Sequence, residues 1–249
     1  MSPFDRTLTE WEETAQRADG DGDIEPRVGP GLPAYLRDTY AWAYLWPASI
    51  RLLDRHPIVT AILWGNYARL QRAALAEIAS GDRVLQPACV YGDLSQNLAG
   101  TVGPAGLLEV CDVAPQQVEN CRRKLGAAGN VRFRLVDAAD HAGGGFDAVC
   151  CFFLLHELPD DHKRRVTDSL LAAVRPGGRV VFVDYRMPAW WHPLKPVMSL
   201  VFDWLEPFAK GLWTSEISAF ASAPAAFDWS KQSYFGGMYQ KTVAVRRSR

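Results

Sequence analysis

Polar side chains capable of binding or proton transfer follow four apolar runs of this 249-residue chain. In chain order they are Asp112, Asp137, His156 with Glu157, and Asp184 with Tyr185. A carboxylate in the position of Asp112 can accept hydrogen bonds from both hydroxyls of a ribose, and Asp137 can accept one from an adenine amino group. Imidazole, carboxyl and phenol groups can donate or accept a proton during a reaction. The spacing therefore indicates a nucleoside-binding site beside a reactive one.

Each of these residues also has a structural interpretation. Asp112 could cap the helix expected to begin near Ala114, and Asp137 could be a turn residue. The later groups could be surface or capping residues. We favour the ribose role for Asp112, because it lies about 20 residues after Gly92 in the loop of the first strand.

The elements that would position these groups alternate in type along the middle of the chain. Strand-like runs occupy residues 82–86, 106–111, 131–136, 146–153 and 179–183. Helical patterns occupy residues 94–99, 114–125 and 160–174. This alternation predicts a doubly wound parallel α/β sheet, in which ligands bind at the carboxyl ends of the strands. The polar groups should therefore share one edge of the sheet.

Two further segments flank the predicted sheet. Residues 33–78 have a helical pattern broken by Pro47 and Pro57, and residues 187–224 carry four tryptophans and five prolines. Strand-like residues 227–235 and 238–245 are joined by two glycines, which favours an antiparallel hairpin. We expect a tail and helical cover over 1–75, a cofactor-binding domain over 76–249, and an aromatic insertion over 188–226.

Composition excludes several classes of protein. The formal net charge is −1, with 27 basic and 28 acidic residues, so nothing attracts nucleic acid to the molecule as a whole. The five cysteines form no C-x-x-C pair, which argues against a disulfide framework or a zinc site. Residues 1–23 are polar and acidic, unlike a targeting peptide, and we expect a cytoplasmic protein.

The loop after the first expected strand departs from the usual glycine-rich form. It reads Gln86-Pro87-Ala88-Cys89-Val90-Tyr91-Gly92, and only Gly92 offers a backbone without a side chain. Together with the other strand ends, it gives the predicted cofactor-binding set. That set is Gln86, Ala88, Cys89, Tyr91, Gly92, Asp112, Val113, Asp137, Ala138 and Phe153.

The order of these motifs resembles the quinone C-methyltransferases and their class I relatives. The resemblance rests on Asp112, Asp137-Ala138, Phe146-Asp147 and the turn Arg175-Pro176-Gly177-Gly178, and it covers residues 60–187 and the 234–240 hairpin. It implies S-adenosylmethionine as cofactor. Gln86 departs from that pattern by replacing an acid, and Cys89 and Val90 fill two glycine positions.

The altered loop, Tyr40-Ala41-Trp42-Ala43-Tyr44 and the Trp-Gly-Asn-Tyr stretch at 64–67 resemble the rhodoquinone biosynthesis protein family (RquA). This resemblance spans essentially the whole chain. It implies that a ring methoxy group of ubiquinone is replaced by an amino group, with S-adenosylmethionine as nitrogen donor and manganese(II) as helper. Without the acid at position 86, the cofactor's amino group is held less firmly in its protonated, non-nucleophilic form.

The predicted catalytic residues are His156, Asp184, Tyr185 and Gln86, with His156 also a candidate metal ligand and Glu157 and His192 weaker candidates. Two alternatives to amino transfer remain: a C- or O-methyltransferase of a prenylated quinone, and an inactive protein that binds the cofactor. The sequence predicts no oligomeric state.

Tryptophan and tyrosine concentrate in residues 35–67 and 190–239, which suits either helix packing or contact with a lipid surface. One possible helical stripe comprises Leu194, Val197, Met198, Val201, Trp204 and Leu205. It could pack on the sheet, or it could form a lip that lets the protein associate peripherally with the inner face of the membrane.

Overall fold

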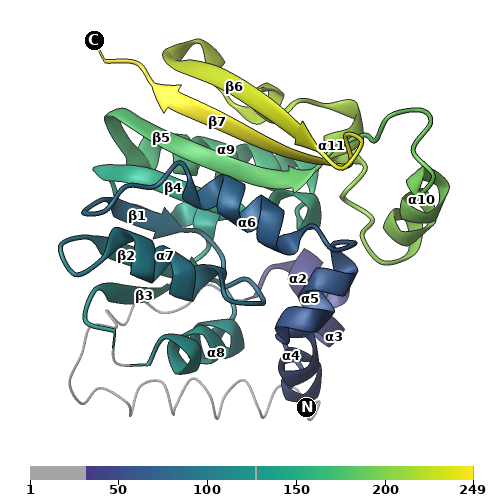
Figure 1. The fold of residues 1–249 in the computed structure, drawn as a ribbon, viewed down its shortest axis with the longest axis horizontal. Helices are drawn as coiled ribbons and strands as arrows, with labels where there is room; N and C mark the ends of the chain where they lie inside the picture. The colour runs from purple at the N-terminus through teal and green to yellow at the C-terminus, as the bar shows by residue number, and fades with distance from the viewer. Residues whose placement is uncertain (1–31, 127, 249) are drawn as a thin grey trace.

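A seven-stranded mixed sheet forms the centre of the computed structural model, which describes residues 32–126 and 128–248 (Figure 1). The strand order is β3-β2-β1-β4-β5-β7-β6. The strands are β1 Arg83–Gln86, β2 Leu107–Asp112, β3 Val131–Leu135, β4 Phe146–Phe152, β5 Val174–Tyr185, β6 Phe227–Tyr234 and β7 Tyr239–Arg246. The first five run parallel, and β7 pairs antiparallel with both β5 and β6. The predicted doubly wound sheet with an antiparallel hairpin is confirmed.

Strand β5 begins earlier than the sequence predicts. The turn Arg175-Pro176-Gly177-Gly178, expected to separate helix and strand, lies within β5. Phe146 pairs with Val174, and the register then shifts before Ala148 pairs with Arg179. The turn is therefore an irregularity inside the strand.

Helices cover both faces of the sheet. One face packs against α6 (Tyr67–Leu75), α7 (Leu94–Val102) and α8 (Pro115–Leu125), whose buried side chains join one apolar cluster with β1 and β2. The other face packs against α9 (Asp160–Ala173). Helix α6 therefore belongs to the core of the sheet domain, although the sequence placed it with the N-terminal cover.

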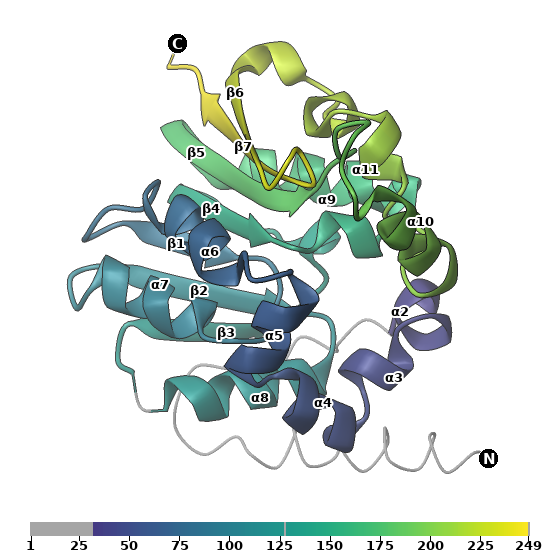
Figure 2. The ribbon, with the colours of Figure 1, turned by 45° about the vertical axis from the view of Figure 1, so that its right-hand side comes forward.

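Short helices form a cover at the carboxyl end of the parallel strands (Figure 2). The N-terminal cover comprises α2 Ala34–Asp38, α3 Ala41–Tyr44, α4 Pro47–Leu53 and α5 His56–Ile62. Pro47 and Pro57 stand in the first turns of α4 and α5, where a missing backbone N–H costs nothing, so each starts a helix after breaking the previous one. The insertion after β5 contributes α10 (Lys195–Trp204), α11 (Gly211–Thr214) and the 3₁₀ turns Ile217–Phe220 and Pro224–Ala226.

The expected stripe on α10 divides into two parts. Met198 is buried, and Leu194 and Val201 pack partly against the core. Val197, Trp204 and Leu205 are exposed instead, as is Leu200 between them. Because α10 lies at the edge of the molecule (Figure 1), only one of its apolar faces meets the protein. No helix within the described ranges is long and apolar enough to cross a bilayer.

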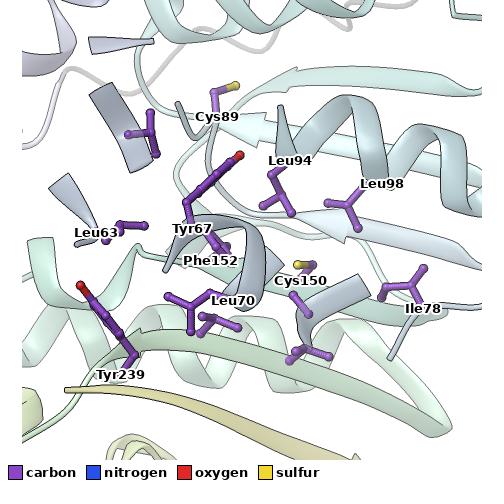
Figure 3. Packing of buried hydrophobic residues seen from close by; sticks show 14 of the residues in the cluster. Leu63, Tyr67, Leu70, Ile78, Cys89, Leu94, Leu98, Cys150, Phe152 and Tyr239 are labelled. Carbon is purple, nitrogen blue, oxygen red and sulfur yellow. The ribbon is translucent and has the colours of Figure 1, made fainter. Parts of the chain in front are cut away.

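Tyr67 of α6 links the core to the loop after β1 (Figure 3). Its hydroxyl accepts a hydrogen bond from the backbone N–H of Asp93 at 2.9 Å and donates to the Asp93 carboxylate at 3.0 Å. Gly92 packs directly on this ring at a φ of 87°, and a Cβ added there would lie 2.4 Å from the Tyr67 hydroxyl. Gly92 is therefore a packing requirement of the core.

We expect Gly92→Ala to destabilise the fold by about 1–3 kcal/mol, because the new methyl group strains the backbone and displaces Tyr67 from Asp93. Gly100→Ala is a matched control, since Gly100 lies in α7 with open space around its Cα, and helical alanine is favoured by about 0.5–1 kcal/mol. Chemical denaturation of both variants measures the difference. Equal stabilities would contradict the packing role of Gly92.

Candidate active site

One cavity of about 430 Å³ lies between the carboxyl ends of the strands and the cover. Many of the predicted site residues line it: Ala88, Cys89, Tyr91, Asp112, Val113, Asp137, Ala138, Phe153, His156, Glu157 and Tyr185. Gln86, Gly92, Asp184 and His192 are absent from the lining. The cavity is otherwise walled by apolar and aromatic side chains of the cover and of α10.

Asp112 holds the loop after β1 in place. One carboxylate oxygen accepts the backbone N–H of Cys89 and the other accepts that of Ala114, both at 2.8 Å. Burial raises the pKa of Asp112 to about 6, although these hydrogen bonds oppose the rise. Each oxygen makes one hydrogen bond and keeps a further lone pair, so the carboxylate can still accept two hydroxyls.

Asp137 is engaged by two neighbours at the next strand end. It accepts the backbone N–H of Ala139 at 2.8 Å and lies 3.1 Å from His162 Nε2 on α9. Burial raises the pKa of Asp137, but the hydrogen bonds from His162 and Ala139 outweigh it, and the net shift is downward. Tyr35 of α2 packs against His162 with ring centroids 5.3 Å apart. Sequence reasoning did not identify His162 or Tyr35.

The structure places Gln86 beneath the loop, where it does not face the cavity. Its Nε2 donates to the carbonyl of Ala88 at 2.7 Å, and its Oε1 is buried without a hydrogen-bond partner. The side chain of Gln86 therefore bonds to its own loop and does not extend into the cavity. The predicted direct contact of Gln86 with a cofactor therefore lacks structural support, although no carboxylate takes its place there.

The loop is also tied to the N-terminal cover. The hydroxyl of Tyr91 donates to the carbonyl of Ala43 at 2.5 Å, and its ring stacks on Tyr44 at 5.5 Å. Lys124 of α8 donates to the carbonyls of Val90 and Gly92 and pairs with Asp54. These contacts hold the loop in place, although it lacks the glycines that usually let the backbone of this loop approach the cofactor closely.

Phe153 is strained at the end of β4. Its φ is 51°, in the left-handed region that costs a bulky residue about 1–3 kcal/mol. Its N–H donates to the carbonyl of Val183 at 2.8 Å, and its ring packs edge-on against His156 and Tyr185. This backbone conformation places the phenyl ring in the wall of the cavity.

Asp184 lies behind His156 and supplies a negative charge next to its ring. The carboxylate is almost fully buried, accepts the N–H of Tyr185 at 2.7 Å, and lies 2.9 Å from His156 Nδ1. Burial lowers the pKa of His156, but the charge and hydrogen bond of Asp184, then Glu206 and Glu157, outweigh it and raise that pKa to about 9. The imidazole is therefore charged at neutral pH, with Nε2 facing Glu157 at 3.8 Å.

Two carboxyl groups face His156 from separate segments. Glu157 accepts a hydrogen bond from the hydroxyl of Tyr44 on α3, and Glu206 follows α10. Burial raises the pKa of Glu157 to about 8, with Glu206 adding to the rise, while His156 and Tyr44 oppose it. Burial likewise raises the pKa of Glu206. Sequence reasoning missed Glu206 and Tyr44, although a lone acid in the apolar run Trp-Leu-Glu-Pro was a usable signal.

Comparisons with known proteins agree with this architecture. Residues 84–178 match a family described as a methyltransferase domain. Ubiquinone/menaquinone biosynthesis C-methyltransferase UbiE of Ectopseudomonas mendocina is 29% identical over 157 residues, and the Pseudomonas putida (strain GB-1) protein of that name is 30% identical. Each alignment covers 60% of this chain and 59% of the relative, so the chain spans less than two thirds of these curated relatives.

Solved structures share the fold. An O-methyltransferase family protein from Burkholderia thailandensis superposes with a TM-score of 0.62 at 18% identity, over 84% of this chain and 64% of that one. N-methyltransferase NodS from Bradyrhizobium japonicum gives 0.54 at 16% identity, over 79% and 100%. The chain has the class I methyltransferase fold. The expected superfamily is thereby supported, and the rhodoquinone resemblance receives no support from these comparisons.

The cavity of this methyltransferase-like domain suits S-adenosylmethionine. Asp112 retains lone pairs for a ribose, and Ala138 with the Asp137–His162 pair forms the adjacent wall. Small-molecule sites are typically apolar cavities with a few fixed polar groups, as here. Asp112, Asp137 and His156 therefore line one cavity, and their roles toward a cofactor stay predictions.

The described residues offer manganese no site comparable to the one that suits S-adenosylmethionine. Across residues 32–126 and 128–248, no group of three or more His, Cys, Asp or Glu side chains is arranged to hold a metal ion. His156, the expected ligand, directs Nδ1 at Asp184 and Nε2 toward Glu157. His192 lies outside the cavity lining, accepts the N–H of Leu194 and packs on Phe235. The described residues are therefore not arranged to bind manganese, and manganese has no part in the steps proposed below.

Proposed function

We propose that this chain is an S-adenosylmethionine-dependent enzyme that modifies the ring of a prenylated quinone. The observation that carries the proposal is a cavity lined both by Asp112, whose carboxylate could accept ribose hydroxyls, and by the titratable groups around His156. The aromatic side chains that also line this cavity suit a flat, apolar ring. When bound, S-adenosylmethionine would supply the group that is transferred.

Methyl transfer is the reaction that the comparisons favour. The family match is to a methyltransferase domain, and the curated relatives are named as quinone C-methyltransferases. For such a reaction the residues must hold and orient the ring, and the aromatic side chains that line the cavity can do so.

Replacement of a methoxy group by an amino group is the second candidate, and it rests on the resemblance to rhodoquinone biosynthesis proteins. Gln86 replaces the acid expected from the methyltransferases, but it bonds to the carbonyl of Ala88 and does not face the cavity, so it supports this candidate only as part of that resemblance. Manganese belongs to this candidate by resemblance alone.

Two quinones separate the reactions. Ubiquinone carries no free ring carbon, so it can lose a methoxy group but cannot gain a methyl group on carbon. A prenylated quinol with one unsubstituted ring carbon can be methylated. Incubating the protein and S-adenosylmethionine with each, followed by mass spectrometry, identifies the reaction by which substrate changes. If neither changes, the proposed function is wrong.

An exposed aromatic rim favours delivery of the substrate from a membrane. We define the rim as Trp42, Trp64, Trp190, Trp191, Leu200 and Trp204. Trp42 and Trp64 also line the cavity, so these two members of the rim border the site. Trp190 and Trp204 are 87% and 79% exposed. Tryptophan side chains suit the boundary between water and lipid, so these two exposed rings are candidates for contact with a bilayer. Contact with the bilayer would let a prenyl tail stay in lipid while the ring enters the cavity.

We expect Trp190→Ser/Trp204→Ser to weaken binding to quinone-containing liposomes by about tenfold or more, because two large apolar rings leave the lipid. Val245→Ser is the matched control: Val245 is exposed but pairs with Arg179 at the opposite end of β5, away from the cavity. Liposome flotation measures the difference. Equal flotation of the two variants and the wild type would exclude the rim as a membrane contact.

A further inference from the structure

A chain of polar groups borders the cavity at the carboxyl ends of β4 and β5. It runs from Asp184 on β5 through His156 to Glu157 and then to Tyr44 of the N-terminal cover. Three segments distant in sequence therefore meet at one point. Only the inner end of this chain, Asp184, is sealed from the cavity.

Two neighbouring buried groups beside this chain lack a well-formed hydrogen bond. They are the hydroxyl of Tyr40, a residue that is 1% exposed, and Oε2 of Glu206, which interact with each other without full hydrogen-bond geometry. Both side chains line the cavity. A buried polar atom without a partner is costly, and such atoms commonly mark a place where a ligand completes the bonding.

The protonation of this group sets what it can bind. The titratable groups that face Glu157 are Tyr35, Tyr40, Tyr44, Tyr91, His156, Asp184, Tyr185 and Glu206. Among them, Asp184 holds His156 in its charged form, and burial with Glu206 nearby holds Glu157 protonated. Tyr40 and Tyr44 are neutral phenols whose pKa values burial raises. The group therefore presents several hydrogen-bond donors to the cavity.

We propose that Tyr40, Glu157 and His156 form a binding site for a ring oxygen of the quinone and stabilise the negative charge that this oxygen acquires. The proposal rests on the proposed function and specifies how the ring is held. Addition of an amine to a ring carbon of the quinone places negative charge on the conjugated ring oxygen, and preorganised donors are the usual means of stabilising it. The neutral carboxylic acid of Glu157 and the imidazolium of His156 would stabilise this negative charge, a role that a metal ion plays in other enzymes.

The proton balance is closed within this group. When a nucleophile adds to a ring carbon conjugated with the bound carbonyl, the π electron pair moves to the oxygen, which takes the proton of Glu157. When the pair returns and the carbonyl re-forms, that proton goes back to Glu157. The methoxy group then leaves as methanol with the proton released by the amine nitrogen, and the product of this step is the quinone joined through that nitrogen to the rest of the donor.

Glu157→Gln tests the proposal, because an amide still donates a hydrogen bond but cannot titrate. We expect wild-type kcat/KM to fall as pH rises through about 8, where Glu157 loses its proton. Glu157→Gln should keep measurable activity and move this fall to higher pH, where His156 titrates. Glu157→Ala and Tyr40→Phe should each reduce kcat, the former by about 100-fold or more. Glu216→Gln, in the exposed pair with Lys231, is the matched control.

Binding of a tailless dimethoxybenzoquinone, measured by calorimetry without cofactor, separates this proposal from the proposed function. Wild-type affinity should fall between pH 7 and pH 10, and the fall should be smaller in Glu157→Gln. That result would support the oxygen site even if no turnover were found. An unchanged pH profile in Glu157→Gln, or wild-type activity in both Glu157→Ala and Tyr40→Phe, would overturn the proposal.

Discussion

Asp112→Ala is expected to weaken the binding of S-adenosylmethionine by about 1–3 kcal/mol, or roughly 5- to 150-fold, because two ribose hydroxyls lose a charged acceptor. The backbone N–H groups of Cys89 and Ala114 also lose their partner, so the loop that follows β1 should loosen. Calorimetric titration measures the affinity. Asp140→Ala, in the exposed pair with Arg165, is the matched control.

The same residue predicts a pH dependence of cofactor binding. Burial raises the pKa of Asp112 to about 6, so the carboxylate form prevails above that pH. Affinity should therefore decrease as pH falls through 6, and Asp112→Ala should remove this decrease. Equal affinity of wild type and Asp112→Ala would leave Asp112 as a loop-capping residue only.

Asp184→Asn is expected to lower the free energy of unfolding by about 3 kcal/mol near pH 6, because the buried imidazolium of His156 loses its counter-charge. The pKa of His156 rises from 6.5 to about 9 on folding. This interaction therefore stabilises the fold fully below pH 6.5 and is lost as pH rises through 9.

Glu157 adds a change of the same sign, since its pKa also rises on folding, from 4.5 to about 8. Wild-type stability should thus decline from mildly acidic to alkaline pH. Asp184→Asn should flatten the part between pH 6.5 and 9. Urea denaturation across this range measures both curves. Parallel curves for the two proteins would mean that Asp184 does not hold His156 in its charged form.

The sheet could be predicted from sequence because its signals are local. Each buried strand is a short apolar run, and residues such as Asp112 mark where a strand ends. Parallel strands place their carboxyl ends together, so the shared position of Asp112, Asp137 and His156 followed from topology. The Arg-Pro-Gly-Gly turn was misplaced because pairing of Val174 with Phe146 extends β5 past it.

The polar end of the cavity depends on contacts that no local pattern contains. Tyr44 meets Glu157 across 113 positions of sequence, and Glu206 reaches the cavity only because α10 packs at the sheet edge. Gln86 shows that the position of a residue in the sequence does not fix the direction of its side chain. Its position at a strand end predicted a cavity residue, but its side chain bonds to the carbonyl of Ala88 instead.

Tracing the atoms of S-adenosylmethionine into the quinone tests the central claim most directly. The protein is incubated with the two quinones and with S-adenosylmethionine labelled either in the methyl group or in the amino nitrogen, and the quinone products are weighed by mass spectrometry. We predict that one label enters the ring of one quinone: the methyl label if the ring is methylated, the nitrogen label if a methoxy group is replaced. A protein that binds S-adenosylmethionine yet transfers neither label to either quinone would contradict the account.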